Sequence, residues 1–348
     1  MKTVRIADRT VGEGVPCFVV AEAGANHNRD FELAKRLIDV AVEARVDAVK
    51  FQTYSADTLY SRKTPRFRYL KDVADTDTHA LLKSIELPRD WQRRLADYAR
   101  EKSIIFFSSP FDTRAVDELD EIGVPLFKIA SFELVDLPLI EYTASKGRPV
   151  VLSTGMATLG EIEEALLTCH KVGNEQIVLL QCASLYPSPA ELINLRSMDT
   201  MRAAFGCPVG LSDHTLGIHV AMGAAARGAA MLEKHFTLDR DMKGPDHPFA
   251  LEPGELRAMV AGIREVESAL GDGRKLGPSP AEADEMYRLA RRSIVAACPI
   301  PRGTPITRDM LTVKRPGFGI KPAQLGIVIG RPARVDIDAD DVITWDMV

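Results

Sequence analysis

Short apolar runs alternate with longer amphipathic segments from the start of the chain to about residue 270. The short runs are rich in Val, Ile and Phe, which is typical of buried parallel strands. They lie at residues 17–21, 48–52, 104–108, 126–129, 150–153, 177–181, 209–211 and 230–233. The longer segments carry apolar residues at helical spacing and predict helices. They lie at residues 31–44, 89–102, 115–122, 137–146, 159–172, 198–205, 218–227 and 255–270.

Strands that are each followed by a helix, repeated in this way, predict a closed (β/α)8 barrel. The main alternative is an open, doubly wound sheet. No G-x-G-x-x-G motif follows the first strand, which argues against the dinucleotide-binding form of that sheet. Residues 53–88 form a longer polar insertion after the second strand. We expect this insertion to be a loop with a short helix over the barrel mouth.

The periodic pattern ends near residues 271–278, where Gly and Pro cluster in G-D-G-R-K-L-G-P. A charged, helix-like stretch follows at residues 280–292, and beyond it short β-prone pieces are separated by many Pro and Gly residues. We therefore predict three parts. They are a catalytic barrel at 1–275, a linker at 276–292 and a small β-rich domain at 293–348.

Composition and charge narrow the class of protein. Hydrophobic residues make up 46% of the chain and charged residues 27%, the balance of a soluble globular protein. The net charge is -5 and no basic tract is present, which argues against nucleic-acid binding. No apolar run reaches the roughly 20 residues that a membrane helix needs. The five scattered cysteines include no C-x-x-C pair, so we expect reduced thiols and a cytoplasmic protein.

The last two predicted strands end in ionisable residues. The seventh leads into G-L-S-D-H-T and the eighth into L-E-K-H-F. Because neighbouring strands in such a barrel are parallel, both ends meet at the same edge of the sheet. His214 and His235 could then share one divalent metal, with positions left for water or substrate. The alternative is that each is an ordinary strand-end histidine bonded to backbone.

Two lysines and a glutamate lie in other predicted strands. Lys50 and Lys128 are flanked by apolar residues, and a buried lysine without an anion is costly. Together with hydroxyls and the amides of an S-T-G turn, they could cradle a phosphate and a carboxylate. Alternatively, each lysine pairs with a neighbouring glutamate. Glu22, which ends the first strand, is a candidate acid/base unless it only bonds to backbone.

Nine motifs along the chain, in order, together resemble those of the sialic acid synthase family. They are E-A-G-A-N-H, V-K-F-Q-T, F-S-S-P-F-D, F-K-I-A-S-F-E, L-S-T-G-M, L-Y-P-S-P, G-L-S-D-H-T, E-K-H-F-T-L-D and G-P-D-H, and V-K-R-P-G follows them. The resemblance implies a (β/α)8 barrel joined to a small antifreeze-like (SAF) domain. It implies that phosphoenolpyruvate condenses with an N-acetylated six-carbon amino sugar to give a nine-carbon acid. It also implies a divalent metal, usually Mn²⁺ or Mg²⁺, and a domain-swapped homodimer.

The same resemblance implies a role for individual residues. The expected phosphoenolpyruvate ligands are Lys50, Ser109, Lys128, Ser131, Ser153, Ser184 and Ser212. The expected sugar-side residues are Gln52, Tyr186, Asp246 and Arg315, the last supplied by the swapped domain. The expected metal ligands are His214 and His235, and the expected catalytic residues are Glu22, His235 and Asp246.

Three departures from the family pattern leave the sugar open. Ser109 stands where Thr is common, Ser184 where N-acetylneuraminate enzymes often have Asn, and Phe132 where they often have Gly. The sugar could therefore be N-acetylmannosamine or a modified hexosamine of the pseudaminate, legionaminate or spore-coat type. Other readings are a synthase of seven- or eight-carbon acids, and a class I aldolase using Lys128 or Lys234. A last one is a catalytically silent sugar-binding protein of coat assembly.

Overall fold

The computed structural model describes residues 2–65 and 77–348. Residues 66–76, which belong to the expected insertion at 53–88, lie outside the described part. The chain divides into two compact units, Met1–Gly271 and Asp272–Val348. Each unit is described by itself.

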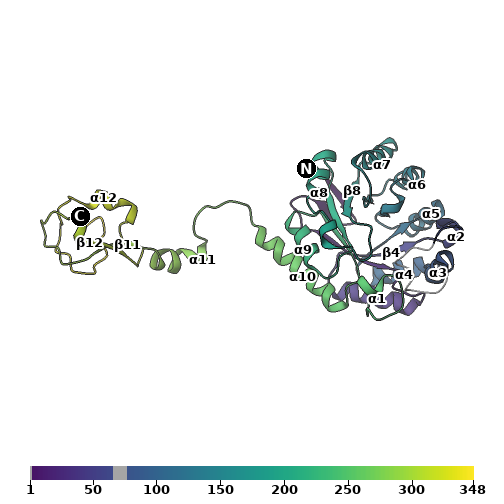
Figure 1. Ribbon diagram of the computed structural model, residues 1–348, viewed down its shortest axis with the longest axis horizontal. Coiled ribbons are helices and arrows are strands. Elements are labelled where there is room, and N and C mark those ends of the chain that lie inside the picture. The colour runs from purple at the N-terminus through teal and green to yellow at the C-terminus, as the bar shows by residue number, and fades with distance from the viewer. Residues whose placement is uncertain (1, 66–76) are drawn as a thin grey trace. The chain divides into compact units, whose positions relative to one another are not determined.

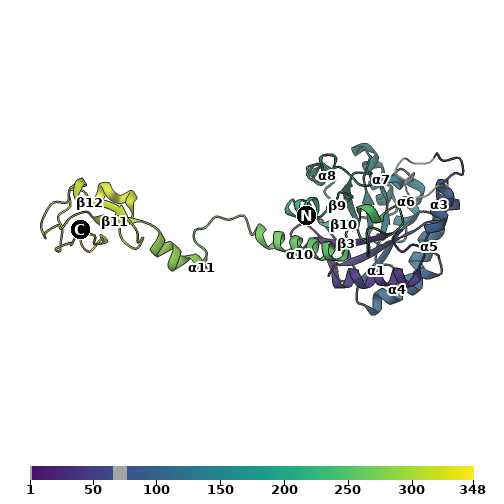
Figure 2. The same cartoon turned by 60° about the horizontal axis from the view of Figure 1, so that its bottom comes forward.

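The first unit is built around parallel strands that curve into a barrel (Figures 1 and 2). The strands are β3 (Phe18–Gly24), β4 (Ala48–Thr53), β5 (Ile105–Pro110), β6 (Phe127–Ile129), β7 (Val150–Ser153), β8 (Ile177–Cys182), β9 (Val209–Asp213) and β10 (Met231–His235). Their order is β5-β4-β3-β10-β9-β8-β7-β6. Between β5 and β6, both fully described, the barrel closes without a hydrogen-bonded ladder. The predicted (β/α)8 architecture is confirmed, and the open doubly wound sheet is excluded.

Helices follow each barrel strand and cover its outer face. They are α1 (Phe31–Glu43), α4 (Trp91–Glu101), α5 (Thr113–Ile122), α6 (Leu137–Ala144), α7 (Leu159–Lys171), α8 (Ser197–Phe205), α9 (His219–Ala226) and α10 (Pro253–Leu270). Aspartates begin several of them: the side chains of Asp30, Asp112 and Asp136 each accept a hydrogen bond from a first-turn amide. Each helix buries one apolar stripe against the strands.

The insertion after β4 contains two short helices in its described part, α2 (Ala56–Leu59) and α3 (Thr78–Ile85). The side chain of Asp77 caps α3 by accepting from the amide of Ala80 at 2.8 Å. These helices agree with the expected helical loop after the second barrel strand.

An N-terminal hairpin precedes the barrel and was not predicted. Strand β1 (Thr3–Ile6) pairs with β2 (Arg9–Gly12) in antiparallel register. Val4, Ile6 and Val11 are buried in the barrel core. Buried and exposed residues alternate in β1, but β2 has two exposed residues followed by two buried ones. The signal for a half-buried strand was therefore confined to the four residues of β1.

The second unit is small and rich in loops. It contains α11 (Pro280–Ala283), a π-helical turn at Met286–Ala290, β11 (Ser293–Ala296), β12 (Leu311–Lys314) and α12 (Leu325–Val328). Strands β11 and β12 form an antiparallel pair. The core of this second unit is a separate cluster of mostly aliphatic side chains, including Ile294, Ile300 and Ile343. The charged stretch at 280–292 forms only short helical turns, because it is mostly exposed and buries no apolar face. In the described chain, no helix has the length and apolar character to cross a membrane.

Candidate active site

The register of the barrel strands brings the predicted polar residues to one edge of the sheet. Glu22 of β3 lies opposite Lys50 of β4 on one side and His235 of β10 on the other. Glu233 of β10 lies opposite Ser212 of β9. All of these side chains are buried. Because parallel strands end at the same rim, the site is built from residues that are far apart in sequence.

Two lysines and two glutamates form a buried charge cluster in the barrel interior. Lys50 Nζ lies 2.8 Å from Glu22 Oε2, 3.5 Å from Glu233 Oε1 and 3.3 Å from Ser109 Oγ. Lys128 Nζ lies 3.9 Å from Glu233 Oε1 and donates to the carbonyl of Ile129. Lys50 is therefore paired with carboxylates, as one alternative reading expected, whereas Lys128 is held more loosely.

Burial and the neighbouring charges shift the pKa values of the groups in this cluster. Burial raises the pKa of Glu22 to about 7, although Lys50 opposes the shift. Burial also favours a raised pKa at Glu233, but the charges of Lys128 and Lys50 hold that pKa below its usual range. Burial lowers the pKa of Lys128. Two lysines thus share this space with Glu233, the one carboxylate whose pKa stays below its usual range, which is an arrangement that suits a bound anion.

Three of the predicted serines lie at or just after the ends of β6, β7 and β8. Ser131 Oγ lies 3.0 Å from Cys182 Sγ, which lies 3.9 Å from Ser184 Oγ. The turn after β7 approaches so closely that a Cβ built on Gly155 would lie 2.5 Å from both Ser131 Cβ and Ser184 Oγ. Ser153 Oγ is buried and has no hydrogen-bond partner among the described residues. An orphaned buried hydroxyl is expected where a ligand supplies the missing partner.

The two predicted metal ligands lie side by side. The ring centroids of His214 and His235 are 5.5 Å apart, and the ring of Tyr186 packs 4.3 Å from that of His214. His214 Nδ1 is 2.9 Å from the carbonyl of Ala183, so it donates there and leaves Nε2 with its lone pair. His235 Nδ1 is buried without a hydrogen-bond partner. Burial lowers the pKa of His214 and holds that of His235 well below its ordinary value, so both rings are neutral near pH 7.

A cavity opens beside the histidines and receives most of the predicted sugar-side residues. Gln52, Tyr186, His235 and Asp246 all line it. Gln52 Nε2 donates to Glu22 Oε1 at 2.7 Å, which links this cavity to the charge cluster. Burial raises the pKa of Asp246 to about 6. Arg315 belongs to the second unit, which the structure describes separately, so its relation to this cavity stays a prediction.

The comparisons with known proteins place this chain in a family. Residues 37–275 match the NeuB family, and residues 291–348 match the SAF domain. The chain belongs to the NeuB family. The resemblance that the sequence motifs predicted, including the C-terminal SAF domain, is therefore confirmed.

Relatives of this NeuB-family chain align over nearly its whole length. It is 40% identical to the N,N'-diacetyllegionaminic acid synthase of Campylobacter jejuni, over 93% of this chain and 98% of that protein. It is 38% identical to the N-acetylneuraminate-9-phosphate synthase of Homo sapiens, over 98% and 95%. It is 34% identical to an N-acetylneuraminic acid synthetase of Leptospira borgpetersenii solved with citrate, with a TM-score of 0.73 over 82% of this chain and 95% of that chain.

Two residues of the NeuB-family site received no role from the sequence. Glu233 contacts both lysines and accepts from Ser212 Oγ at 3.4 Å, and Cys182 lies between two of the predicted serines. Strand periodicity could have found Glu233, because it lies two residues before His235 and so shares its face. Cys182 carried no comparable signal, since a lone cysteine reads as a core residue.

The same periodicity weakens the class I aldolase reading for Lys234. This residue alternates with Glu233 and His235 and so points away from the barrel interior. Its Nζ is bound to Asp213 Oδ2 at 2.7 Å and to the carbonyl of Thr215 at 2.6 Å. A lysine held in a buried ion pair on the outer face of the strand is poorly placed to attack a substrate carbonyl.

Proposed function

We propose that this protein is a nonulosonic acid synthase. It would condense phosphoenolpyruvate with the open-chain form of an N-acetylated six-carbon amino sugar to give a nine-carbon 2-keto-3-deoxy acid and phosphate. The observation that carries this proposal is the buried cluster of Lys50, Lys128 and Glu233 beside two neutral histidines, at the carboxyl ends of barrel strands. Two of the relatives, named as synthases of N,N'-diacetyllegionaminic acid and of N-acetylneuraminate 9-phosphate, support the same class of product.

In this proposal, the lysines and serines bind phosphoenolpyruvate. Its phosphate and carboxylate are already charged in the ground state, so Lys50 and Lys128 serve mainly binding and positioning. Ser153, with its orphaned hydroxyl, is a ready hydrogen-bond donor for one of these anionic groups. The remaining expected ligands are Ser109, Ser131, Ser184 and Ser212.

A divalent cation, Mn²⁺ or Mg²⁺, is part of the proposal, and the residues present fit it. His235 Nδ1 is buried, makes no hydrogen bond and lies 3.6 Å from Asp246 Oδ2, and His214 keeps one ring nitrogen free, which suits two imidazole ligands. Among the described residues, no group of three His, Cys, Asp or Glu side chains could hold a metal, so water or substrate would complete the coordination. When bound, such an ion would act as a Lewis acid towards the sugar aldehyde.

The chemical step joins carbon 3 of phosphoenolpyruvate to the aldehyde carbon of the sugar. Water then adds at carbon 2, and phosphate leaves with cleavage of its C–O bond. Glu22, with a pKa near 7, would take the proton from that water or relay one to the new hydroxyl. Gln52 fixes one oxygen of Glu22, and Asp246 would hold a polar group of the sugar.

The test is a turnover assay with the full-length protein. Phosphoenolpyruvate and Mn²⁺ are incubated with N-acetylmannosamine and related N-acetylated hexosamines, and phosphate release and product mass are measured for each. We expect one equivalent of phosphate per nine-carbon acid, loss of turnover after chelation and recovery on adding Mn²⁺. No phosphoenolpyruvate consumption with any sugar would overturn the synthase assignment. Full turnover in chelator, with no metal bound, would overturn the metal assignment alone.

A further inference from the structure

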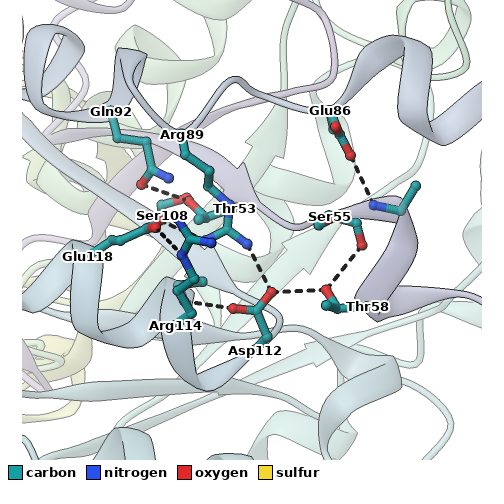
Figure 3. Close-up of polar contacts among 12 residues, drawn as sticks. Thr53, Ser55, Thr58, Glu86, Arg89, Gln92, Ser108, Asp112, Arg114 and Glu118 are labelled. Atoms are coloured by element: carbon teal, nitrogen blue, oxygen red, sulfur yellow. Dashed lines mark hydrogen bonds and ion pairs between the residues drawn. The ribbon is translucent and has the colours of Figure 1, made fainter.

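Asp112 ends the F-S-S-P-F-D motif and received no role from the sequence. It lies between β5 and α5, and its carboxylate accepts three hydrogen bonds (Figure 3). Oδ1 accepts from the amide of Ala115 at 2.7 Å and so caps α5. Oδ2 accepts from Thr58 Oγ1 at 3.0 Å and from Arg89 at 2.9 Å. One carboxylate thus joins three parts of the chain, namely α5, the segment before α4, and α2 in the insertion after β4.

Helix α2 has little of its own to hold it in place. It is four residues long, Ala56 is its one buried residue, and the side chain of its N-cap, Ser55, makes no capping hydrogen bond. A helix of one turn is not stable alone in water, and most helices in proteins are stabilised by packing of an apolar face, which α2 lacks. Its position therefore depends on polar contacts.

The polar contacts of α2 are of two kinds. Two of them join α2 to α3 within the insertion: Glu86 Oε2 accepts from the first amide of α2 at 2.9 Å, and Asp57 pairs with Lys83 at 2.8 Å. The third is the hydrogen bond from Thr58 to Asp112, which reaches the barrel rim after β5. The first two would move with the insertion, so the third is the one of these contacts that places α2 against the barrel.

The Thr58 hydroxyl has a second acceptor within reach. Its Oγ1 lies 3.2 Å from the carbonyl oxygen of Ser55 and 3.0 Å from Asp112 Oδ2. A hydroxyl has one proton to donate, and a carboxylate is a stronger acceptor than a neutral carbonyl. Arg89 also binds Glu118 of α5 at 2.8 Å, so it holds the Asp112 carboxylate from a fixed position. The acceptor for Thr58 is therefore in place independently of α2.

The end of α2 forms part of the cavity beside the histidines. Leu59, its last residue, and Tyr60, which follows it, line that cavity together with His235 and Asp246. The residue that binds Asp112 directly precedes this lining. If α2 were free to move, a ligand in the cavity would have to order it, and the free energy of that ordering would be lost from binding.

We propose that Asp112 is a positioning residue for the sugar site. By holding Thr58, it keeps the end of α2 in its place in the cavity lining. This inference rests on the proposed function, and it assigns Asp112 no contact with either substrate. The two lysines expected to bind phosphoenolpyruvate lie in strands β4 and β6, whose positions the sheet fixes. Binding of phosphoenolpyruvate should therefore not depend on Asp112.

Two substitutions break this contact, one from each side. Thr58→Val keeps the branched shape of the side chain and removes the hydroxyl. Asp112→Ser keeps a good N-cap for α5 but lacks the second oxygen, which binds Thr58. Thr58→Ser, which retains the hydroxyl, should behave like wild type. Thr168→Val and Asp30→Ser are the matched controls, because Thr168 donates to a carbonyl within α7, Asp30 caps α1, and neither lines the cavity.

Steady-state kinetics of the full-length protein measure the effect on each substrate, with the N-acetylated hexosamine that gives the highest turnover in the panel above. We expect Thr58→Val to raise the KM for this sugar about 5- to 10-fold, within the range for one hydrogen bond, while kcat and the KM for phosphoenolpyruvate change less than about twofold. Asp112→Ser should raise the sugar KM at least as much, because Arg89 loses a partner as well. Amide hydrogen exchange of the substrate-free protein should be faster over residues 54–60 in both variants.

Other results would overturn the inference. They are an unchanged sugar KM in Thr58→Val and Asp112→Ser, an equal rise in the KM for phosphoenolpyruvate, and the same rise in the two controls. Unchanged hydrogen exchange over residues 54–60 would also overturn it, because α2 would then keep its place without Asp112. If no sugar supports turnover by the wild type, the proposed function is wrong, and the hydrogen exchange still decides whether Asp112 holds α2.

Discussion

At the scale of single residues, Lys50 and Lys128 are not equivalent. Lys50 Nζ contacts Glu22 and Glu233, at 2.8 and 3.5 Å, whereas Lys128 Nζ comes no closer than 3.9 Å to Glu233. Burial alone would lower the pKa of Lys50, yet the two carboxylates raise it, while the pKa of Lys128 stays lowered by burial. Lys50 is therefore held by the protein's own carboxylates, whereas the ion pair that Lys128 makes with Glu233, at 3.9 Å, is long and leaves this lysine more available to a ligand.

We predict that this difference separates stability from binding. Lys50→Met should lower the free energy of unfolding by about 3–5 kcal/mol, because two buried carboxylates lose their main cation. Lys128→Met should change it by less than about 1.5 kcal/mol, since the shape is conserved and Glu233 keeps Lys50. Both should lose about 2–4 kcal/mol of phosphoenolpyruvate affinity. Denaturant unfolding and calorimetric binding measure the two quantities.

If Lys50→Met and Lys128→Met are equally stable, the prediction is wrong, because the pairing of Lys50 with two carboxylates would then add no stability. Normal phosphoenolpyruvate affinity in either variant would remove that lysine from the proposed cradle. Wild type in the same buffer, with binding measured below the transition region, is the reference for both comparisons.

A second prediction at this scale concerns pH. If Glu22 is the base, it must be ionised, so kcat/KM should fall as the pH drops below about 7 and approach a tenfold loss per unit. The Glu22→Gln variant should lose most of its activity, and the activity that remains should no longer fall in this way at low pH. Burial also raises the pKa of Glu133 to about 7, so Glu133→Gln is the matched control. If the fall of kcat/KM at low pH persists in Glu22→Gln but disappears in Glu133→Gln, Glu133 is the group whose protonation causes it.

The sequence located most of these residues but not their partnerships. Lys50, Lys128 and Glu22 could be chosen because ionisable residues at the ends of apolar runs are rare and costly. Which carboxylate sits nearest which lysine depends on barrel register and side-chain direction, which no local pattern encodes. That is why Glu233, at the centre of the cluster, received no role from the sequence.

At the scale of elements, two loops dock together to place Asp246. The loop after β3 donates the amide of Ala25 to Asp246 Oδ2 at 3.3 Å, and Asn28 Oδ1 lies 3.2 Å from His247 Nε2. Gly24 lies beneath this contact with φ +51°, and a Cβ there would come within 2.5 Å of Asp246 Oδ2. The loop therefore needs glycine both for its backbone conformation and for the space that the carboxylate occupies.

We predict that Gly24→Ala displaces Asp246 and weakens sugar use. The left-handed backbone should cost about 1–2 kcal/mol of stability, and the clash should raise the KM for the sugar while phosphoenolpyruvate binding stays normal. Gly14→Ala is the matched control, because Gly14 has φ +79° and nothing within 4 Å of its would-be Cβ. Equal effects of the two substitutions on the sugar KM would show that strain, not the clash, is responsible.

The sequence predicted helices and strands correctly where the hydrophobic periodicity is strong. It missed them where the periodic stretch is short. All the barrel strands and their helices could be placed, because buried runs and amphipathic helices repeat many times. The hairpin of β1 and β2 was missed, since two four-residue strands give too few alternations. The apolar part of the cavity lining could not be foreseen either. Leu59, Leu82, Phe111 and Phe132 come from α2, α3 and the segments after β5 and β6, and only the folded barrel brings them to one cavity.

At the scale of the whole molecule, the change of composition near residue 293 reflects a second unit with its own core. The change could be read from the sequence because short β-prone pieces rich in Pro and Gly differ from the barrel repeat. The position of this unit relative to a barrel could not be read from the sequence, because it depends on which surfaces pack together and not on local pattern. The structure does show one chemical feature of this unit, the side chain of Arg315. Arg315 follows β12 and is exposed, and within the described residues its guanidinium has no ion pair or hydrogen bond.

The turn that carries Arg315 is held on both sides. Lys314 pairs with Asp340, and the amide of Gly317 donates to the carbonyl of Arg288 at 2.6 Å. An unpaired guanidinium on a fixed turn is well suited to planar hydrogen bonding, for example to an amide oxygen of an N-acetylated sugar. A small domain also gains stability from a surface to pack on. We propose that this surface is the barrel mouth of a second subunit, as the sequence resemblance implies.

We therefore predict that Arg315 of one subunit completes the sugar site of the other in a homodimer. Arg315→Ala should lose sugar affinity while keeping its fold and phosphoenolpyruvate binding. The decisive measurement mixes Arg315→Ala with His235→Ala, each inactive alone. Random exchange makes about half of the dimers mixed, and each mixed dimer holds one intact site of two, so activity should recover towards about a quarter of wild type. If Arg315 instead serves its own barrel, one site of a mixed dimer lacks Arg315 and the other lacks His235. No activity would then return, even with exchange confirmed by mass spectrometry of the mixed dimers.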